Sequence, residues 1–224
     1  MKKSIFLVGL VITLISCQSR PSAESAGAGD AQKVATAAGS EYNLNTTTSV
    51  LNWKGQKPDG EHIGTVSITD GKLYAEYGKL VSGTFTIDFN SIIDTDLTDA
   101  DMNGKLVGHL KSADFFDVAQ FPSAKFELVS VAEIPVGTAT STEGIVANHQ
   151  ITGNLVMKGV SKSISFPAQI TISEGSITAV TAPFAIDRTQ WGVNYGSKSI
   201  FAELKDKFIN DEMIISLNLS FSKI

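Results

Sequence analysis

Val81-Ser82-Gly83-Thr84-Phe85-Thr86-Ile87-Asp88-Phe89-Asn90 is the stretch of this 224-residue chain that decides its fold. Hydrophobic or small side chains at the odd positions alternate with polar side chains at the even positions. A strict period of two, carried by β-branched and aromatic residues, predicts a strand that is buried on one face. The end of the chain repeats the pattern with Met213, Ile215, Leu217, Leu219 and Phe221 on one face, so half-buried strands are expected there too.

Other parts of the chain show the same alternation and are divided by turn signals. Strand-like runs cover residues 51–53, 125–131, 145–157, 164–172 and 177–186. Turn signals separate them, such as Pro58-Asp59-Gly60 and Asp70-Gly71, and the second of these is typical of a hairpin. Many strands at short spacing, without long helices between them, predict an antiparallel sandwich or barrel.

One stretch, residues 101–112, breaks the β pattern and predicts a short helix. The residues that recur there every four positions, and so share one helical face, are Met102, Leu106 and Leu110. Asp99 or Asp101 stands where a helix cap is needed, and a second turn is expected near residues 114–118. A helix with this stripe packs across a sheet or closes the end of a barrel, and residues 102–118 are a candidate lid.

The first seventeen residues predict export and lipid attachment. Lys2 and Lys3 precede an apolar run over residues 5–15, which is too short to span a membrane and is typical of a secretory signal. Leu14-Ile15-Ser16-Cys17 resembles the bacterial lipobox, whose cysteine receives a lipid and becomes the first mature residue. We therefore expect a lipoprotein signal peptide at residues 1–16 and lipid attachment at Cys17, the only cysteine. The alternative is an ordinary signal that contains a cysteine.

Residues 17–40 are expected to form a flexible tether before a single folded domain of residues 41–224. The tether is rich in Ala, Ser and Gly and has almost no large apolar side chains to bury. Removing residues 1–16 takes away two lysines, which leaves 18 − 2 = 16 basic against 23 acidic residues and a formal charge of −7. This charge argues against a nucleic acid partner and leaves membrane attachment to the lipid anchor.

Four motifs, in the same order along the chain, resemble those of the YceI-like domain family. They are Phe85-Thr86-Ile87-Asp88 leading to Ser91-Ile92; His109-Leu110-Lys111-Ser112-Ala113-Asp114-Phe115-Phe116-Asp117-Val118 followed by Phe121-Pro122-Ser123-Ala124-Lys125-Phe126; Gly153-Asn154-Leu155-Val156-Met157-Lys158-Gly159-Val160; and Arg188-Thr189-Gln190-Trp191-Gly192. Together they cover most of residues 41–224. Gln190 departs from the pattern, because an acidic residue is common at that position in the family.

The resemblance implies an all-β fold: an eight-stranded antiparallel, lipocalin-like barrel with one or two short helices, around a long apolar tunnel. It also implies a ligand, because members of the family are associated with binding polyisoprenoid lipids in the cell envelope and are not, as a rule, enzymes. The residues expected to line the tunnel are Phe85, Ile87, Leu106, Leu110, Phe115, Phe116, Phe126, Leu128, Trp191 and Phe201. His109 and Arg188 are candidates for the head-group contact, since a guanidinium suits a diphosphate.

These observations predict a membrane-anchored envelope lipoprotein that binds, transports or stores an isoprenoid lipid of the prenyl phosphate or quinone type. Gln18 replaces the acidic residue often linked with retention in the inner membrane, so resemblance to that sorting rule favours the outer membrane, facing the periplasm. No other cofactor is implied, and the sequence leaves the oligomeric state open.

Motifs of catalysis and of metal binding are not found in the sequence. His62, His109 and His149 lie far apart and show no metal-binding spacing. The acidic run from Asp94 to Asp101 lacks the spacing of a calcium loop and is interpreted as a solvated loop whose last acids cap the helix. Two alternatives stay open: a hydrolase or isomerase that uses a spatial cluster of His62, His109 and Asp88, and an envelope stress or interaction module with a solid barrel.

Overall fold

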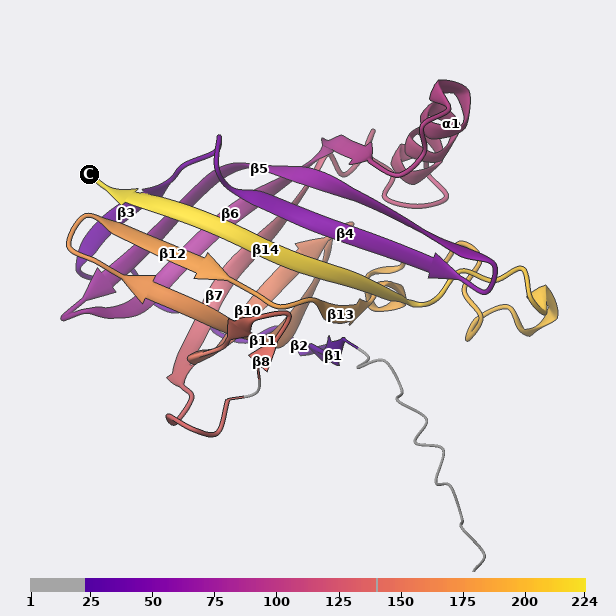
Figure 1. The fold of residues 1–224 in the computed structure, drawn as a ribbon. Helices are drawn as coiled ribbons and strands as arrows, with labels where there is room; N and C mark the ends of the chain where they lie inside the picture. Colours follow the sequence, from indigo (N-terminus) through magenta and orange to yellow (C-terminus); the bar gives the residue numbers. More distant parts are fainter. Residues whose placement is uncertain (1–22, 140) are drawn as a thin grey trace, which may run out of the picture.

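The computed structural model describes residues 23–139 and 141–224, and its main feature is a closed ring of antiparallel strands (Figure 1). Cys17 and the expected signal peptide lie outside the described residues. The strands of the ring are β4 (Val50–Lys57), β5 (Gly60–Glu76), β6 (Lys79–Asp94), β7 (Ser123–Glu133), β10 (His149–Met157), β11 (Val160–Ile172), β12 (Ser176–Val180) and β14 (Glu212–Lys223).

The ring closes because the last strand, β14, pairs with β12 on one side and with β4 on the other. The expected all-β fold is therefore confirmed. Shorter strands extend the sheet where a long strand would otherwise lose its partner: β3 (Ser40–Leu44) pairs with β5 and β14, and β13 (Phe184–Asp187) pairs with β14. β8 (Ser141–Thr142) and β9 (Ile145–Val146) form a separate small hairpin.

The alternation seen in the sequence sets which side chains fill the inside of the barrel. Phe85, Ile87 and Phe89 of β6 are buried, and the polar residues between them face outward. An aromatic row crosses the barrel, with ring centroids 5.0 Å apart for Phe85–Phe126, 5.8 Å for Phe126–Phe166 and 4.5 Å for Phe166–Phe184. Gly153 makes room for it, since a Cβ atom there would lie 2.1 Å from the Phe126 ring.

One α-helix, α1 (Ala100–Lys111), stands at one end of the barrel (Figure 1). The carboxylate of Asp99 caps it by accepting a hydrogen bond from the Met102 N–H, as the sequence allows. No residue of α1 is fully buried. Two 3-10 helices follow later, η1 (Arg188–Trp191) and η2 (Ala202–Leu204). Within residues 23–139 and 141–224, no helix combines the length and apolar character needed to cross a bilayer.

The segment expected to be a flexible tether differs from that expectation over residues 24–36, which lie along the outer surface of the barrel. We call these residues the strap. Its first part, β1 (Glu24–Ser25), pairs in parallel with β13, and β2 (Gly29–Asp30) pairs with β11. Between them, the Ala26 N–H donates to the carbonyl of Ala185, and the Ala26 carbonyl accepts from the Ser165 N–H. The strap thus joins β11 to β13 beyond the end of β12.

Near its C-terminal end, the strap also bonds to β6 and β7, at the point where the pairing of these two strands stops. The β6–β7 pairing stops at Thr84 and Glu127, and just beyond it the Ala35 N–H donates to the carbonyl of Leu128. The Ala35 carbonyl accepts from the Ser82 hydroxyl of β6. A segment without large apolar side chains is ordered here by backbone hydrogen bonds to strand edges that would otherwise lack partners.

Replacing Asn154 by alanine is expected to loosen the strap and to destabilise the protein by about 1–3 kcal/mol. The buried Asn154 amide accepts from the Gln32 N–H at 2.9 Å and donates to the Gln32 carbonyl at 2.7 Å. Urea unfolding and the rate of proteolytic cleavage within residues 24–36 measure the two effects. Asn52→Ala is the matched control, because exposed Asn52 bonds only the Ser216 hydroxyl, and equal losses for both variants would contradict the role of the strap.

Candidate ligand-binding site

The end of the barrel beside α1 encloses an apolar cavity of about 160 Å³, which we call the mouth cavity. Strands β4, β5, β6, β7, β10, β13 and β14, helix α1 and the residues just before β14 contribute to its wall. Its apolar side chains include Ile87, Phe89, Leu106, Leu110, Phe115 and Phe116. Residues with polar side chains also line it, among them Lys54, Gln56, His62, His109 and Asn210. This combination suits an elongated ligand with an apolar body and a polar end.

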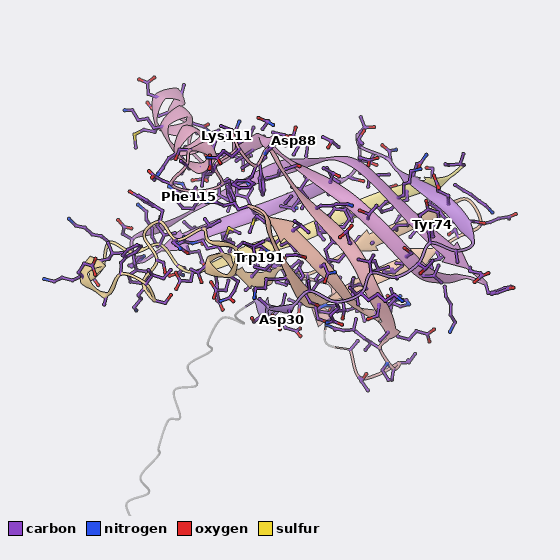
Figure 2. All side chains as sticks on the ribbon, turned by 180° about the vertical axis from the view of Figure 1, so that it is seen from behind. Asp30, Tyr74, Asp88, Lys111, Phe115 and Trp191 are labelled. Carbon is purple, nitrogen blue, oxygen red and sulfur yellow. The ribbon has the colours of Figure 1, made fainter. Side chains whose placement is uncertain are left out.

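The chain after α1 anchors the helix to the cavity. The Phe116 N–H donates to the carbonyl of Leu110, and the Phe116 ring stacks on Phe89 with centroids 4.6 Å apart. Phe115 lies at the base of α1 (Figure 2) and is buried with Phe116. Leu106 and Leu110 of the predicted stripe face the mouth cavity, whereas Met102 is exposed. The helix is thus held at its C-terminal end and covers the cavity only with half-buried side chains.

The other half of the barrel contains a second cavity of about 50 Å³, and the two cavities share no lining residue. The boundary falls between Ile87 and Phe85 on β6 and between Ala124 and Phe126 on β7. The aromatic row fills this level of the barrel. The expected continuous tunnel is therefore interrupted, because the Phe126 ring occupies the space above Gly153.

The structure distributes the ten predicted lining residues over both cavities and the rest of the molecule. Those in the mouth cavity are Ile87, Leu106, Leu110, Phe115 and Phe116. Those in the second cavity are Phe85, Phe126 and Leu128. Trp191 and Phe201 line neither cavity, which corrects the expectation for these two residues.

Trp191 and Phe201 fail as lining residues for opposite reasons. Trp191 has no exposed surface, and its indole N–H donates to the carbonyl of Leu155 at 2.9 Å, so it is a packed part of the core. Phe201 is 38% exposed and precedes η2 in the loop after β13, away from the interior. An aromatic residue in the sequence does not by itself distinguish a cavity wall from a solid core or an exposed loop.

Arg188, a predicted head-group ligand, borders the mouth cavity but directs its donors into the protein. It is 1% exposed, and its guanidinium donates to the carbonyls of Asn210 at 3.1 Å, Val193 at 2.6 Å and Ile209 at 3.1 Å. Burial lowers the pKa of Arg188, and nearby Asp211 and Asp187 oppose that shift. The side chain fixes the loop between η1 and β14, which forms one wall of the cavity.

His109 and His62 both line the mouth cavity, but the third residue of the cluster that the enzymatic alternative requires, Asp88, does not. The ring of His109 contacts Tyr195 edge-on at 4.5 Å and lies 3.5 Å from the carboxylate of Asp114. Asp88 lies between the buried Ile87 and Phe89, faces outward, and accepts hydrogen bonds from Asn90. The expected cluster of His62, His109 and Asp88 is therefore not formed.

His62 instead lies beside two carboxylates that the sequence interpretation placed in a solvated loop. Its Nδ1 is 3.0 Å from Oδ2 of Asp96 and 3.9 Å from Oδ2 of Asp94. Burial raises the pKa of Asp94, partly offset by the Leu97 N–H. Burial acts the same way on Asp96, but the Ile63 N–H and His62 outweigh it and lower the pKa of Asp96. The feature that could have indicated this cluster is the pairing of residues 60–76 with residues 79–94, because it brings His62 and the two aspartates together at one end of the barrel.

Trp53 is a further polar group of the site that the sequence did not single out. It lines the mouth cavity, and its buried indole N–H has no hydrogen-bond partner among the described residues. Its ring lies over Gly64 of the neighbouring strand, where a Cβ atom would be 2.6 Å from the ring. This donor is available to an acceptor atom of a ligand.

Eight antiparallel strands thus close into a barrel that has an apolar cavity at one end. The chain belongs to the YceI-like domain family, whose model matches residues 42–221, so the resemblance found in the sequence is confirmed. A "UPF0312 protein" of Shewanella denitrificans is 31% identical over 114 residues, 50% of this chain and 51% of that protein. "Protein YceI" of Salmonella arizonae is 33% identical over 106 residues, 44% of this chain and 49% of that protein. The matched region thus spans about half the length of these curated relatives.

Solved structures share the fold at low sequence identity. BcnA of Burkholderia cenocepacia matches with a TM-score of 0.57 and 22% identity, over 79% of this chain and 98% of that chain. A structure described as a polyisoprenoid binding domain from Saccharophagus degradans matches with a TM-score of 0.54 and 17% identity, over 86% of this chain and 100% of that chain. These likenesses establish the architecture.

Proposed function

We propose that this protein binds an amphiphilic isoprenoid lipid, of the prenyl phosphate or quinone type, and carries or stores it in the cell envelope. The observation that carries the proposal is the mouth cavity, whose surface is apolar and whose lining also includes residues with polar side chains such as Lys54 and His62. The polyisoprenoid binding described for the Saccharophagus degradans domain supports the same ligand class. Binding and release need no catalytic group, so the proposed role is not enzymatic.

The size of the mouth cavity sets how much of a lipid tail the barrel holds without rearrangement. An apolar cavity of roughly 150 Å³ accepts a ligand the size of benzene, so about one isoprene unit fits into 160 Å³. Burial of its five carbons contributes roughly 3–4 kcal/mol, less than the association cost of about 4–15 kcal/mol. Useful affinity therefore requires further units, and we propose that α1 moves outward to admit them.

The expected cellular location is part of the proposal. The lipobox-like sequence ending in Cys17 supports lipid attachment, and Gln18 favours the outer membrane, facing the periplasm. Attachment through Cys17 would keep the barrel near the membrane that supplies its ligand. The acidic chain gives no support for a nucleic acid partner.

Native mass spectrometry of the gently purified protein, followed by organic extraction, tests the ligand class. We expect an adduct with the mass of a prenyl lipid, which disappears after extraction and returns when a prenyl phosphate or quinone is added. A protein that is reproducibly free of lipid and also fails to take up added prenyl lipids contradicts the proposal.

Ala124→Leu is expected to block ligand binding by filling the mouth cavity. Ala124 is buried and lines the cavity from β7, so three added carbon atoms would occupy the proposed site of the tail. Because the space is already empty, the free energy of unfolding should change by less than about 1.5 kcal/mol. Ala132→Leu on the exposed side of the same strand is the control. Equal lipid uptake by both variants, measured by native mass spectrometry, would place the ligand elsewhere.

A further inference from the structure

Three potential metal ligands converge beside the mouth cavity. They are Nδ1 of His62 on β5, Oδ2 of Asp94 at the end of β6, and Oδ2 of Asp96 just beyond it. All three atoms lie within 4.8 Å of one another. A tetrahedral zinc site with bonds of about 2.1 Å separates its ligand atoms by about 3.4 Å, so only small movements would bring these atoms to that spacing.

The second oxygen of each carboxylate is held by the protein, which fixes the direction of the first. Oδ1 of Asp94 accepts hydrogen bonds from the Leu97 N–H at 2.9 Å and from the Asn103 amide at 3.1 Å. Oδ1 of Asp96 accepts from the Ile63 N–H at 2.7 Å. Ligating carboxylates in metal sites are oriented in this way by partners outside the coordination shell.

The observation that points to a bound ion is the environment of Oδ2 of Asp94. The side chain of Asp94 has no exposed surface, and its Oδ2 has no hydrogen-bond partner among the described residues. An unpaired carboxylate oxygen shielded from water is costly. It points toward His62 Nδ1 across a gap of 3.9 Å, too long for a hydrogen bond and suited to an ion between the two atoms.

We propose that His62, Asp94 and Asp96 bind a divalent transition metal ion, with Zn²⁺ as the representative ion. One imidazole nitrogen and two carboxylate oxygens form a mixed set that zinc accepts, and three protein ligands leave at least one coordination position open. His62 also lines the mouth cavity, so the ion lies beside the proposed lipid site. Asn103 of α1 contacts Asp94, which links the metal site to the helix that covers the cavity.

A proton is the rival occupant of the same position. Burial raises the pKa of Asp94, whereas the Ile63 N–H and His62 lower the pKa of Asp96. A metal ion that binds these carboxylates must displace any proton that they hold.

Titration of the full chain with Zn²⁺ alone, without lipid, tests the metal site by calorimetry and by the shift of the melting temperature. We expect one ion per chain, and a loss of affinity of at least about tenfold in Asp94→Asn and in His62→Gln, since even partners outside the coordination shell change metal affinity by about 10–100-fold. Asp94→Asn keeps the Oδ1 acceptor, and its amide can donate to Asp96. The melting temperature of the metal-free variant should therefore equal or exceed that of the wild type.

His109→Gln is the matched control, because His109 lines the same cavity but its one carboxylate neighbour is Asp114, outside the cluster of His62, Asp94 and Asp96. It should leave zinc binding unchanged. Absence of 1:1 binding in the wild type overturns the proposal, as does undiminished binding in a folded Asp94→Asn variant. Because the probe is the metal ion without lipid, a negative result leaves the lipid-binding proposal standing, and an absence of lipid does not affect this test.

Discussion

Arg188→Met is expected to lower the free energy of unfolding by about 3–5 kcal/mol, in the range observed when one partner of a buried charge network is removed. The guanidinium is 1% exposed and donates to three backbone carbonyls, those of Val193, Ile209 and Asn210. Methionine fills similar space without donors, so all three acceptors would lose a charge-assisted hydrogen bond inside the protein. Urea unfolding followed by circular dichroism measures the loss.

The same variant distinguishes a structural role from a head-group role for Arg188. We expect Arg188→Lys to be destabilised as well, because a single ammonium cannot reach three carbonyls in the planar arrangement of a guanidinium. Lys198→Met is the control. It removes an exposed cation from the loop between η1 and β14, where the Lys198 ammonium lies 4.6 Å from the centre of the Phe208 ring. It should lower the free energy of unfolding by less than about 1 kcal/mol. Loss of lipid binding in Arg188→Met with unchanged stability would instead assign Arg188 to the ligand.

Phe126→Ala is expected to destabilise the protein by about 3–5 kcal/mol and to join the two cavities. Phe126 is buried at the boundary between them, stacks on Phe85 at 5.0 Å and covers Gly153. Removing its ring opens space between the mouth cavity and the second cavity, so longer prenyl chains should be retained. Urea unfolding measures the first effect, and native mass spectrometry with prenyl phosphates of increasing length measures the second.

Phe201→Ala provides the matched control for this experiment. Phe201 is 38% exposed and lines neither cavity, so its loss should change stability by less than about 0.5 kcal/mol and leave the accepted chain length unchanged. Phe126→Leu serves as a milder variant if the alanine variant does not fold. A folded Phe126 variant with the chain-length preference of the wild type would show that the aromatic row does not limit the bore.

Most of the fold could be predicted from the sequence, because the alternation of apolar and polar residues that defines each strand is a local pattern. Alternation in residues 81–90 and 213–221 reports which face of each strand is buried, and it held in the structure. The strap was not accessible in this way. Its residues are small and polar, and they are ordered by the edges of β6, β7, β11 and β13, which composition cannot reveal.

The site was less accessible because it depends on contacts between distant residues. Eight of the ten predicted lining residues face one of the two cavities, but no local pattern indicated that the aromatic row would divide the interior of the barrel. His62 and Asp96 are 34 residues apart and meet only through the register of β5 with β6. Arg188 stands out in the sequence because the chain has only two arginines. Its role, however, is decided by the carbonyls of Ile209 and Asn210, which lie 21 and 22 residues further along the chain.

If Cys17 carries the proposed lipid, the strap limits how far the barrel can move from the membrane. Six residues, 18–23, separate Cys17 from Glu24, which is paired with Phe184 of β13. At about 3.5 Å per residue, a lipid on Cys17 can lie no more than about 25 Å from Glu24. Such a short connection would keep the barrel close to the bilayer, so a prenyl chain would cross little water on its way to the protein.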